Sequence, residues 1–481
     1  MKQPGIRILL ATVALMLLVA PAWAEIEFFG TAKVKPTVYT DFDFQSSEHD
    51  APIGNEGGLT DGEHIRGEFR LGWKAKGDKW SVKMIAEADV LYEKDTADRS
   101  FYKFAEKEDQ PNSGGEFGIE RVELLYTFLP QLELETGWDV RALDIKTGGL
   151  LFGDDHPFIG FRGKLSQQTS YEALYITVQN RQPISTAPSP EWGSSTEDDW
   201  RVYTLKLVQD LGGESTALPQ NAFFGNADAE RDTLKFSVSP IYAYSDNDSK
   251  HAQIHYYGLE ITGQAGWFKP YFEVVAADGE FDDGKDISSW AMFAGLEMTI
   301  NKAFNPYVAF RYTQGDDDDT DNDVDGWVGV GDIAMYSGLI GMDGNVLGSD
   351  MRQSYGATLY SYTPGGATTG NRYGGNGNGS SGDNPGQKLI AVGTRGDLSA
   401  LVPKLMYKTQ AFFIWYDETD NLGADVDDYA GTTFDLQLLY AISKNFSIDY
   451  LFSTFIPGDG IEDQYGDDTA FVNTLTLAWS Y

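Results

Sequence analysis

The sequence predicts an all-β protein, a transmembrane antiparallel up-and-down β-barrel of about 18 strands with long extracellular loops. Three observations carry this prediction: apolar and polar residues alternate along most of the chain, short connections alternate with long ones, and the chain opens with a secretory signal. Alternation with a period of two is typical of a strand that has one apolar face and one polar face.

The first segment, residues 1–24, has the composition of a cleaved signal peptide. Two basic residues precede the short apolar stretch Ile8–Ala20, and Ala22-Trp23-Ala24 is a small-x-small cleavage site. The apolar stretch is shorter than the roughly 20 residues that a membrane-spanning helix needs. We therefore expect cleavage near Ala24 and a mature chain, residues 25–481, that forms one barrel domain in the outer membrane of a Gram-negative bacterium.

Composition excludes several classes of protein. The formal net charge is −37, from 36 basic and 73 acidic residues. Sequence-independent nucleic-acid binding requires clustered lysine and arginine, so it is excluded as the main function. Aromatic residues make up 14% and hydrophobic residues 41% of the chain, which argues against disorder. The sequence contains no cysteine, so neither disulfides nor thiolate metal sites stabilise the fold.

Each strand is predicted from its own alternation. In residues 26–44 one face is apolar, and the other carries polar residues that include Lys33 and Lys35. Residues 63–77 and 80–92 repeat this pattern on either side of a tight turn. The same criterion predicts strands at 26–44, 63–77, 80–92, 117–128, 132–143, 158–165, 169–179, 200–210, 231–244, 252–265, 267–278, 288–300, 304–314, 387–397, 403–416, 432–443, 446–456 and 469–481.

The predicted connections differ in length at the two ends of the strands. Short ones lie at 77–79, 129–131, 166–168, 265–266, 301–303, 398–402 and 444–445. Long ones lie at 45–62, 93–116, 144–157, 180–199, 279–287, 315–386, 417–431 and 457–468. The long connection 211–230 and the short connection 245–250 depart from the alternation. An even number of strands places both termini at the short-turn end, as in outer-membrane barrels.

Two further features favour a membrane barrel over a secreted β-sandwich or β-solenoid with one solvated face, which is the alternative. A sheet that crosses hydrocarbon must close so that every backbone group is paired. Aromatic residues near the strand ends suit interfacial girdles; they include Trp73, Trp80, Tyr126, Phe128, Trp138, Trp267, Phe446, Trp479 and Tyr481. The last strand, with its terminal aromatic residue, resembles the recognition signal of the outer-membrane assembly machinery, which we expect as a partner together with lipid and lipopolysaccharide.

Charged residues on the polar faces predict a wet lumen, because about 18 strands enclose water unless something fills the barrel. The candidate pore-lining residues are Lys33, Lys35, Arg66, Arg70, Lys74, Lys83, Arg121, Arg141, Arg162, Arg311, Glu68, Glu87 and Glu123. They could form cross-strand ion pairs that stiffen the wall, or a basic ladder opposed by acids that selects solutes by charge. Either outer loop 144–157 or 315–386 could fold inward and narrow the pore.

Three short patches resemble the alginate-export family of outer-membrane proteins and, more loosely, porins of about 18 strands. They are Gly137–Gly163, Tyr312–Gly326 and Ser453–Gly460. The resemblance implies a channel lined by arginine and lysine that exports a uronate polymer. It implies that Arg66, Arg70, Arg121, Arg141, Arg162 and Arg311 contact an anionic solute. The polar faces also carry many acidic residues. These support, at least as well as the export of a uronate polymer, a porin for the passive diffusion of hydrophilic solutes.

The remaining expectations concern other classes of function. An outer-membrane enzyme would need a base beside a nucleophile or a water molecule; among the five histidines, only His156 beside Asp154-Asp155 suggests a dyad. A purely structural barrel is the third class. We expect no required cofactor. The acidic run Gly315–Gly326 places Asp321, Asp323, Asp325 and Asp332 at the spacing of a calcium loop, although a solvated loop tip has the same composition.

Overall fold

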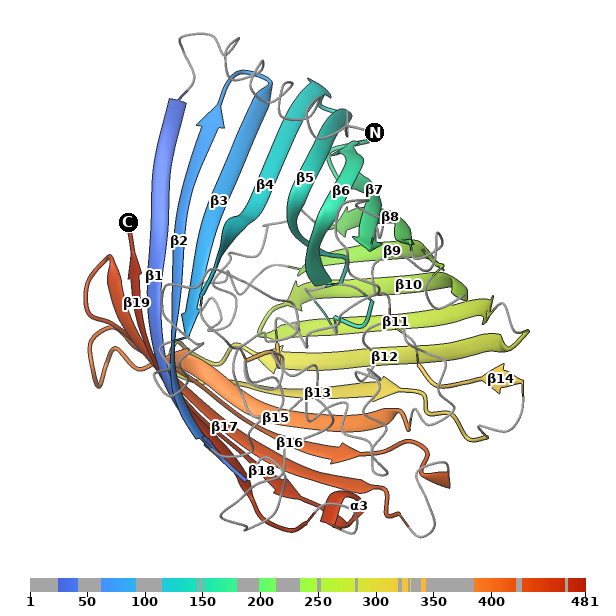
Figure 1. Ribbon diagram of the computed structural model, residues 1–481, viewed down its shortest axis with the longest axis vertical. Coiled ribbons are helices and arrows are strands. Elements are labelled where there is room, and N and C mark those ends of the chain that lie inside the picture. The colour runs from blue at the N-terminus through green and yellow to red at the C-terminus, as the bar shows by residue number, and fades with distance from the viewer. Residues whose placement is uncertain are drawn as a thin grey trace, which may run out of the picture.

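The computed structural model describes residues 25–41, 62–91, 115–144, 147, 149–151, 153–179, 199–212, 234–248, 252–281, 284–318, 322–327, 329, 339–342, 385–420, 426–462 and 466–481. The predicted signal peptide lies outside these residues. The described part is one large curved sheet (Figure 1). No helix within it is long and apolar enough to cross a membrane.

Long strands follow one another along the chain. Their bounds are β1 Glu25–Thr40, β2 Gly62–Lys76, β3 Trp80–Leu91, β4 Gly115–Leu129, β5 Leu132–Ala142, β6 Gly153–Lys164, β7 Thr169–Gln179, β8 Trp200–Leu211, β9 Leu234–Asn247, β10 Ala252–Ala265, β11 Phe268–Phe281, β12 Asp286–Met298, β13 Asn305–Thr313, β15 Gln387–Asp397, β16 Leu405–Trp415, β17 Tyr429–Ala441, β18 Phe446–Pro457 and β19 Ala470–Ser480. Two short elements lie in connections: β14 Asp323–Val324 and α3 Asp459–Glu462.

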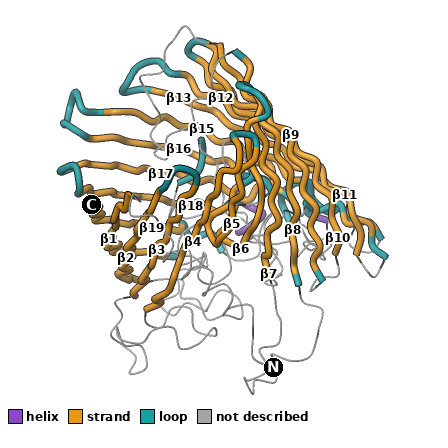
Figure 2. The backbone as a smooth tube through the Cα atoms, turned by 90° about the horizontal axis from the view of Figure 1, so that it is seen from above, coloured by secondary structure: helices purple, strands orange, loops and turns teal. Residues whose placement is uncertain are grey.

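The sheet closes on itself. Every long strand pairs in antiparallel register with its neighbours in the chain, and β1 pairs with both β2 and β19. Strands β1 and β19 lie side by side (Figure 2). Thr31 lies opposite Ser480 and Thr40 opposite Phe471 across this closing seam. The two-residue strand β14 is outside the ring and runs parallel to β12. The predicted fold, a closed antiparallel barrel of 18 strands, is therefore confirmed.

Most strand bounds agree with the predicted ranges to within a few residues, and two connections differ. Strand β6 begins at Gly153, five residues before the predicted start at 158. The segment Gly153–Pro157 contains glycine, aspartate and proline, which are depleted in strands, but it pairs with the end of β5, where Asp139 lies opposite His156. The predicted long connection 279–287 is short, because β11 extends to Phe281 and β12 begins at Asp286.

The outer face of the barrel is apolar. Large side chains along it are well exposed, among them Phe28, Leu71, Trp138, Tyr257 and Trp479. The predicted girdle residues Tyr126, Phe128, Trp138, Trp267, Trp479 and Tyr481 belong to this face and are between 37% and 63% exposed. A soluble protein rarely exposes so continuous an apolar surface.

The opposite face encloses the interior, and two segments from the long-loop end fold onto it. Leu143, Leu150 and Leu151, from the connection between β5 and β6, are buried in one cluster with side chains of the inner wall. Leu339 and Ile340, from the connection between β13 and β15, belong to the same cluster. Both expected inward-folding loops, 144–157 and 315–386, therefore contribute a segment to the interior, which we call segment 143–151 and segment 339–342.

An interior glycine permits the packing of segment 339–342. A Cβ atom at Gly295 on β12 would lie 2.7 Å from Leu339 Cδ2, closer than van der Waals contact allows. The absence of a side chain at this position leaves room for the segment against the wall.

Candidate functional site

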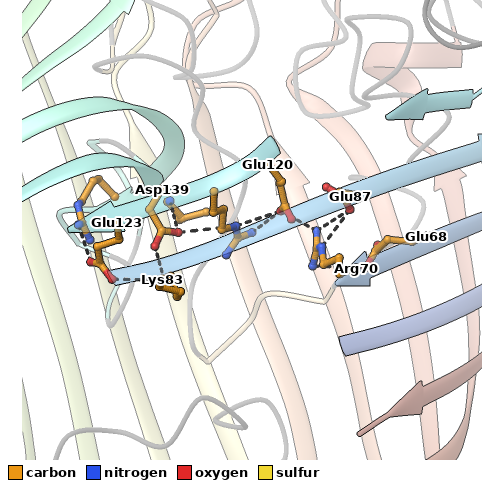
Figure 3. A network of polar contacts seen from close by, with 10 residues as sticks. Glu68, Arg70, Lys83, Glu87, Glu120, Glu123 and Asp139 are labelled. Carbon is orange, nitrogen blue, oxygen red and sulfur yellow. Dashed lines mark hydrogen bonds and ion pairs between the residues drawn. The ribbon is translucent and has the colours of Figure 1, made fainter. Parts of the chain in front are cut away.

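A continuous network of ion pairs, which we call the charge ladder, lies on the inner wall from β1 to β6. Figure 3 shows its central part. It joins seven basic and seven acidic residues. Its members are Lys33, Lys35, Glu68, Arg70, Lys83, Glu87, Glu120, Arg121, Glu123, Glu133, Glu135, Asp139, Arg141 and Arg162.

The ladder begins around Glu68 on β2. Its carboxylate contacts Lys33 on β1 at 2.7 Å and Arg70 on its own strand at 3.3 Å, with Lys35 at 3.9 Å. The guanidinium of Arg70 also reaches Glu87 on β3 at 3.0 Å. These residues are adjacent because strand periodicity places alternate residues of each strand on one face, and cross-strand register then aligns them.

A β-bulge continues the ladder onto β4. Arg121 lies opposite Ile85 of β3, whereas Ile119 lies opposite Ala86, so the intervening Glu120 has no partner in β3. The extra residue lets two consecutive side chains, Glu120 and Arg121, reach the inner wall. Strict alternation along residues 117–128 placed Glu120 on the outer face, which is why the sequence did not reveal this residue.

The middle of the ladder crosses from β4 to β3 and β5. Arg121 lies 3.6 Å from Asp139, which also forms an ion pair with Lys83. Lys83 contacts Glu123 at 3.4 Å, and Glu123 accepts a hydrogen bond from Arg141 at 2.9 Å. Each of these two carboxylates, Asp139 and Glu123, therefore lies between two cations from different strands, which fixes the positions of the cations.

The ladder ends on β6. Arg162 donates to Glu133 at 2.7 Å and lies 3.2 Å from Glu135, which Arg141 approaches at 3.6 Å. The guanidinium of Arg141 also stacks over the ring of Phe158, with 3.7 Å between its carbon and the ring centroid. The side chains of Lys33, Arg70, Lys83, Arg121 and Arg162 are 26% to 38% exposed, so solvent in the interior reaches them.

On the inner wall beyond the ladder, polar residues are covered by the two infolded segments. Lys206 on β8 donates to the carbonyl oxygen of Leu143 and forms an ion pair with Glu260 at 3.2 Å. The hydroxyl of Thr147 donates to Glu273 at 2.6 Å and lies 3.2 Å from Glu260. These contacts tie segment 143–151 to three strands, β8, β10 and β11.

Segment 339–342 is tied to the wall in a similar way. The ammonium of Lys408 on β16, which is completely buried, donates to the carbonyl oxygen of Gly341 at 2.6 Å. Nearby, Arg395 forms a bidentate pair with Glu297 at 2.6 and 2.8 Å. Strand alternation in 387–397 and 403–416 could have identified Arg395 and Lys408 as inward-facing, whereas the contacts to the infolded segment depend on tertiary structure.

The predicted pore-lining residues fall into three groups. Ten are members of the ladder: Lys33, Lys35, Arg70, Lys83, Arg121, Arg141, Arg162, Glu68, Glu87 and Glu123. Arg66 and Lys74 lie on the same face of β2, nearer its two ends. Arg311 on β13 is only 1% exposed, so the structure places it under cover rather than at a solvent-exposed position where a solute would contact it.

The predicted calcium ligands are only partly described. Asp321 and Asp332 lie outside the described residues, while Asp323 is exposed in β14 and Asp325 is half-buried. Among the residues that the structure describes, no group of three acidic, histidine or cysteine side chains could hold a metal ion. The calcium site therefore stays a prediction.

The structure describes the side chains of two histidines, while those of Asp154 and Asp155, the other members of the suggested dyad, lie outside the described residues. His156 is half-buried on the inner face of β6. His255 lies on the outer face, where Tyr242 donates or accepts a hydrogen bond at 2.9 Å and Tyr244 stacks on the ring at 4.7 Å between centroids.

Comparisons with known proteins support the fold. The solved structure of Pseudomonas aeruginosa OpdL is similar with a TM-score of 0.53 and 12% identity, covering 95% of this chain and 99% of that one. Acinetobacter baumannii OccAB4 is similar with a TM-score of 0.52 and 13% identity, covering 96% and 99%. Pseudomonas aeruginosa OpdK, solved with vanillate, is similar with a TM-score of 0.51 and 11% identity, covering 95% and 98%.

At these identities the likeness shows the barrel fold alone. No protein-family model matches the chain, and no curated protein matches it in sequence. The resemblance to the alginate-export family, which rests on three short patches, therefore stays a prediction.

Proposed function

We propose that this chain is an outer-membrane channel for the passive diffusion of hydrophilic solutes, including anionic ones. The observation that carries the proposal is the solvent-accessible charge ladder inside a closed barrel whose outer face is apolar. Charged groups on the inner wall favour water and ions in the lumen, while the apolar outer face suits lipid. The arrangement explains why polar and apolar residues alternate along most of the strands.

The same arrangement supports the location and the partners. A barrel with an apolar outer band and aromatic residues at its rims fits the outer membrane, with lipid and lipopolysaccharide around it. The terminal strand β19 pairs with β1 at the closing seam, which fits a chain inserted by the assembly machinery through its last strand. The pore would run beside the ladder, because the infolded segments cover the inner wall elsewhere.

The balance of charges favours small solutes over a polyanion. Each ladder arginine already contacts at least two carboxylates, as Arg70 does with Glu68, Glu87 and Glu120. A uronate polymer would have to compete with these internal partners at every step, whereas a small solute needs only one or two transient contacts. OpdK was solved with vanillate, an aromatic carboxylate, so small carboxylates are the first anions to test here.

Liposome swelling tests the proposal. Purified protein in proteoliposomes should admit neutral sugars, zwitterionic amino acids and small carboxylates, with rates that fall as solute size increases. Swelling no faster than that of protein-free liposomes would contradict it. Uronate oligomers and neutral oligosaccharides of equal length serve as inhibitors: selective inhibition by the uronates would support the dedicated exporter of an alginate-like polymer instead.

A further inference from the structure

Glu120 occupies an unusual place in the ladder. It is the unpaired residue of the bulge in β4, and it lies between Arg70 on β2 and Arg121 on β4. Its contacts join the part of the ladder around Glu68 to the part around Asp139. The side chain is 10% exposed, whereas the side chains of Arg70 and Arg121 are 29% and 26% exposed.

The two oxygens of this carboxylate differ in their contacts. Oε1 lies 2.9 Å from Nη2 of Arg70. The same oxygen lies 3.0 Å from Nε and 2.9 Å from Nη2 of Arg121. Oε2 is buried and has no hydrogen-bond partner within the described part of the chain. A buried carboxylate oxygen without a donor is unfavourable, because it has lost water and gained no partner. Stability alone therefore gives a poor account of a glutamate at this position.

The arrangement around Glu120 is that of a carboxylate bound between two guanidinium groups. Guanidinium groups bind carboxylates strongly, and two of them converging on one oxygen form an anion site. Here the protein's own side chain fills the site. The other contacts of the two arginines are unequal. Arg70 retains Glu68 and Glu87, while among the described residues Arg121 retains the more distant Asp139, which Lys83 also binds.

We propose that Glu120 is an internal competitor that sets the ion selectivity of the lumen. Its carboxylate occupies the anion-binding face of Arg70 and Arg121, so an anionic solute, a small carboxylate above all, binds there only by displacing it. This inference rests on the proposed channel function. It assigns the selectivity of the channel to a residue of the bulge and not to the net charge of the wall alone.

Reversal potentials in a salt gradient across a planar bilayer test the proposal. Glu120→Gln keeps the size of the side chain but removes its charge, so the anion-to-cation permeability ratio should rise about threefold, as expected for a unit charge several ångströms from the ion in water. Glu120→Asp should leave the ratio near that of the wild type. Glu280→Gln removes an exposed carboxylate from the outer face of β11 and should change nothing.

A double variant tests whether the effect of Glu120→Gln depends on Arg121, which contacts Glu120 through both Nε and Nη2. Glu120→Gln combined with Arg121→Gln should therefore return the anion-to-cation permeability ratio to the wild-type value. Glu120→Gln combined with Lys33→Gln has the same net charge but removes a cation that pairs with Glu68 instead, so it should keep the raised ratio if the competition is local. Replacing chloride by benzoate should enlarge the effect of the single variant, whereas replacing sodium by potassium should not. Heat-modifiable migration in gels checks that each variant has formed a barrel. If Glu120→Gln does not form one, the single variant Arg121→Gln takes its place as the test, and it must lower the anion-to-cation permeability ratio.

The outcomes distinguish the two levels of the account. A wild-type protein without conductance would contradict the proposed channel function itself. A conducting wild type whose reversal potential is unchanged in Glu120→Gln, or changed equally by Glu280→Gln, would overturn the inference about Glu120 and leave the channel intact.

Discussion

The buried ammonium of Lys408 donates a hydrogen bond to the carbonyl oxygen of Gly341, 2.6 Å away, and so joins strand β16 to a segment of the long connection between β13 and β15. Lys206 does the same for Leu143 on the other infolded segment. Two lysines of the wall, on different strands, each hold a loop backbone in the interior. The width of the lumen should therefore depend on these two contacts.

The substitution Lys408→Met should release segment 339–342. Methionine fills a similar volume, but the carbonyl of Gly341 loses its donor, which costs about 1–3 kcal/mol for a buried group. Hydrogen–deuterium exchange of peptides that cover 339–342 should become faster, and single-channel currents should become larger and noisier. Lys404→Met is the control, since exposed Lys404 donates to the carbonyl of Ile442 at the short-turn end. Equal effects of the two variants would refute the role of Lys408.

Thr147→Val should loosen segment 143–151. Valine has the shape of threonine without the hydroxyl that donates to Glu273 and lies near Glu260, so the buried carboxylate of Glu273 loses this donor. We expect a loss of about 1–3 kcal/mol in urea unfolding and more frequent current fluctuations. Thr169→Val is the matched control, because its hydroxyl bonds Gln209 near a short turn. Identical current traces for wild type and Thr147→Val would argue against this contact as a tether.

Arg162→Gln should shift selectivity toward cations, opposite to the change expected for Glu120→Gln. Arg162 is the most exposed ladder arginine and contacts both Glu133 and Glu135. Its loss leaves Glu135, which is fully buried, with Arg141 at 3.6 Å as its remaining cation among the described residues, so the barrel should also lose about 1–3 kcal/mol of stability. The reversal potential gives the sign of the shift. A shift toward anions would show that the ladder does not control ion passage.

Glu418, in the connection between β16 and β17, should make stability depend on pH. Burial, and then the negative charges of Asp417 and Asp317, raise the pKa of Glu418 above its ordinary value. The folded state therefore binds a proton at pH values where the unfolded chain has released it, so stability should fall as pH rises from the ordinary pKa of glutamate through the raised one.

Urea unfolding at a series of pH values from about 4 to 7 would measure this dependence. In Glu418→Gln the free energy of unfolding should fall less steeply with pH over that interval than in the wild type. The gain in stability over the wild type should be largest at the highest pH values. A slope that is unchanged by the substitution would show that other groups determine the pH dependence.

Much of the fold follows from alternation along the chain, because a period of two fixes which face each residue occupies once a strand is recognised. Ten of the fourteen ladder residues follow from that rule alone as predicted pore-lining residues, as with Arg70 and Glu87 on neighbouring strands. The same alternation along β5 places Glu133, Glu135 and Asp139 on its inner face.

Three features of the fold and the site could not be predicted from the alternation of polar and apolar residues. The bulge at Glu120 shifts the phase within one strand, and no local signal in residues 117–128 marks it. The early start of β6 depends on pairing with β5, which overrides the poor strand propensity of Gly153–Pro157. Arg311 is 1% exposed, and alternation along its strand shows which face it occupies but not whether that position is covered.

Conductance of the wild-type protein in a planar bilayer under a salt gradient tests the central claim most directly. The account predicts stable open steps with a small reversal potential, because seven basic and seven acidic side chains balance along the ladder. A correctly folded barrel that inserts into the bilayer and gives no conductance steps would contradict it.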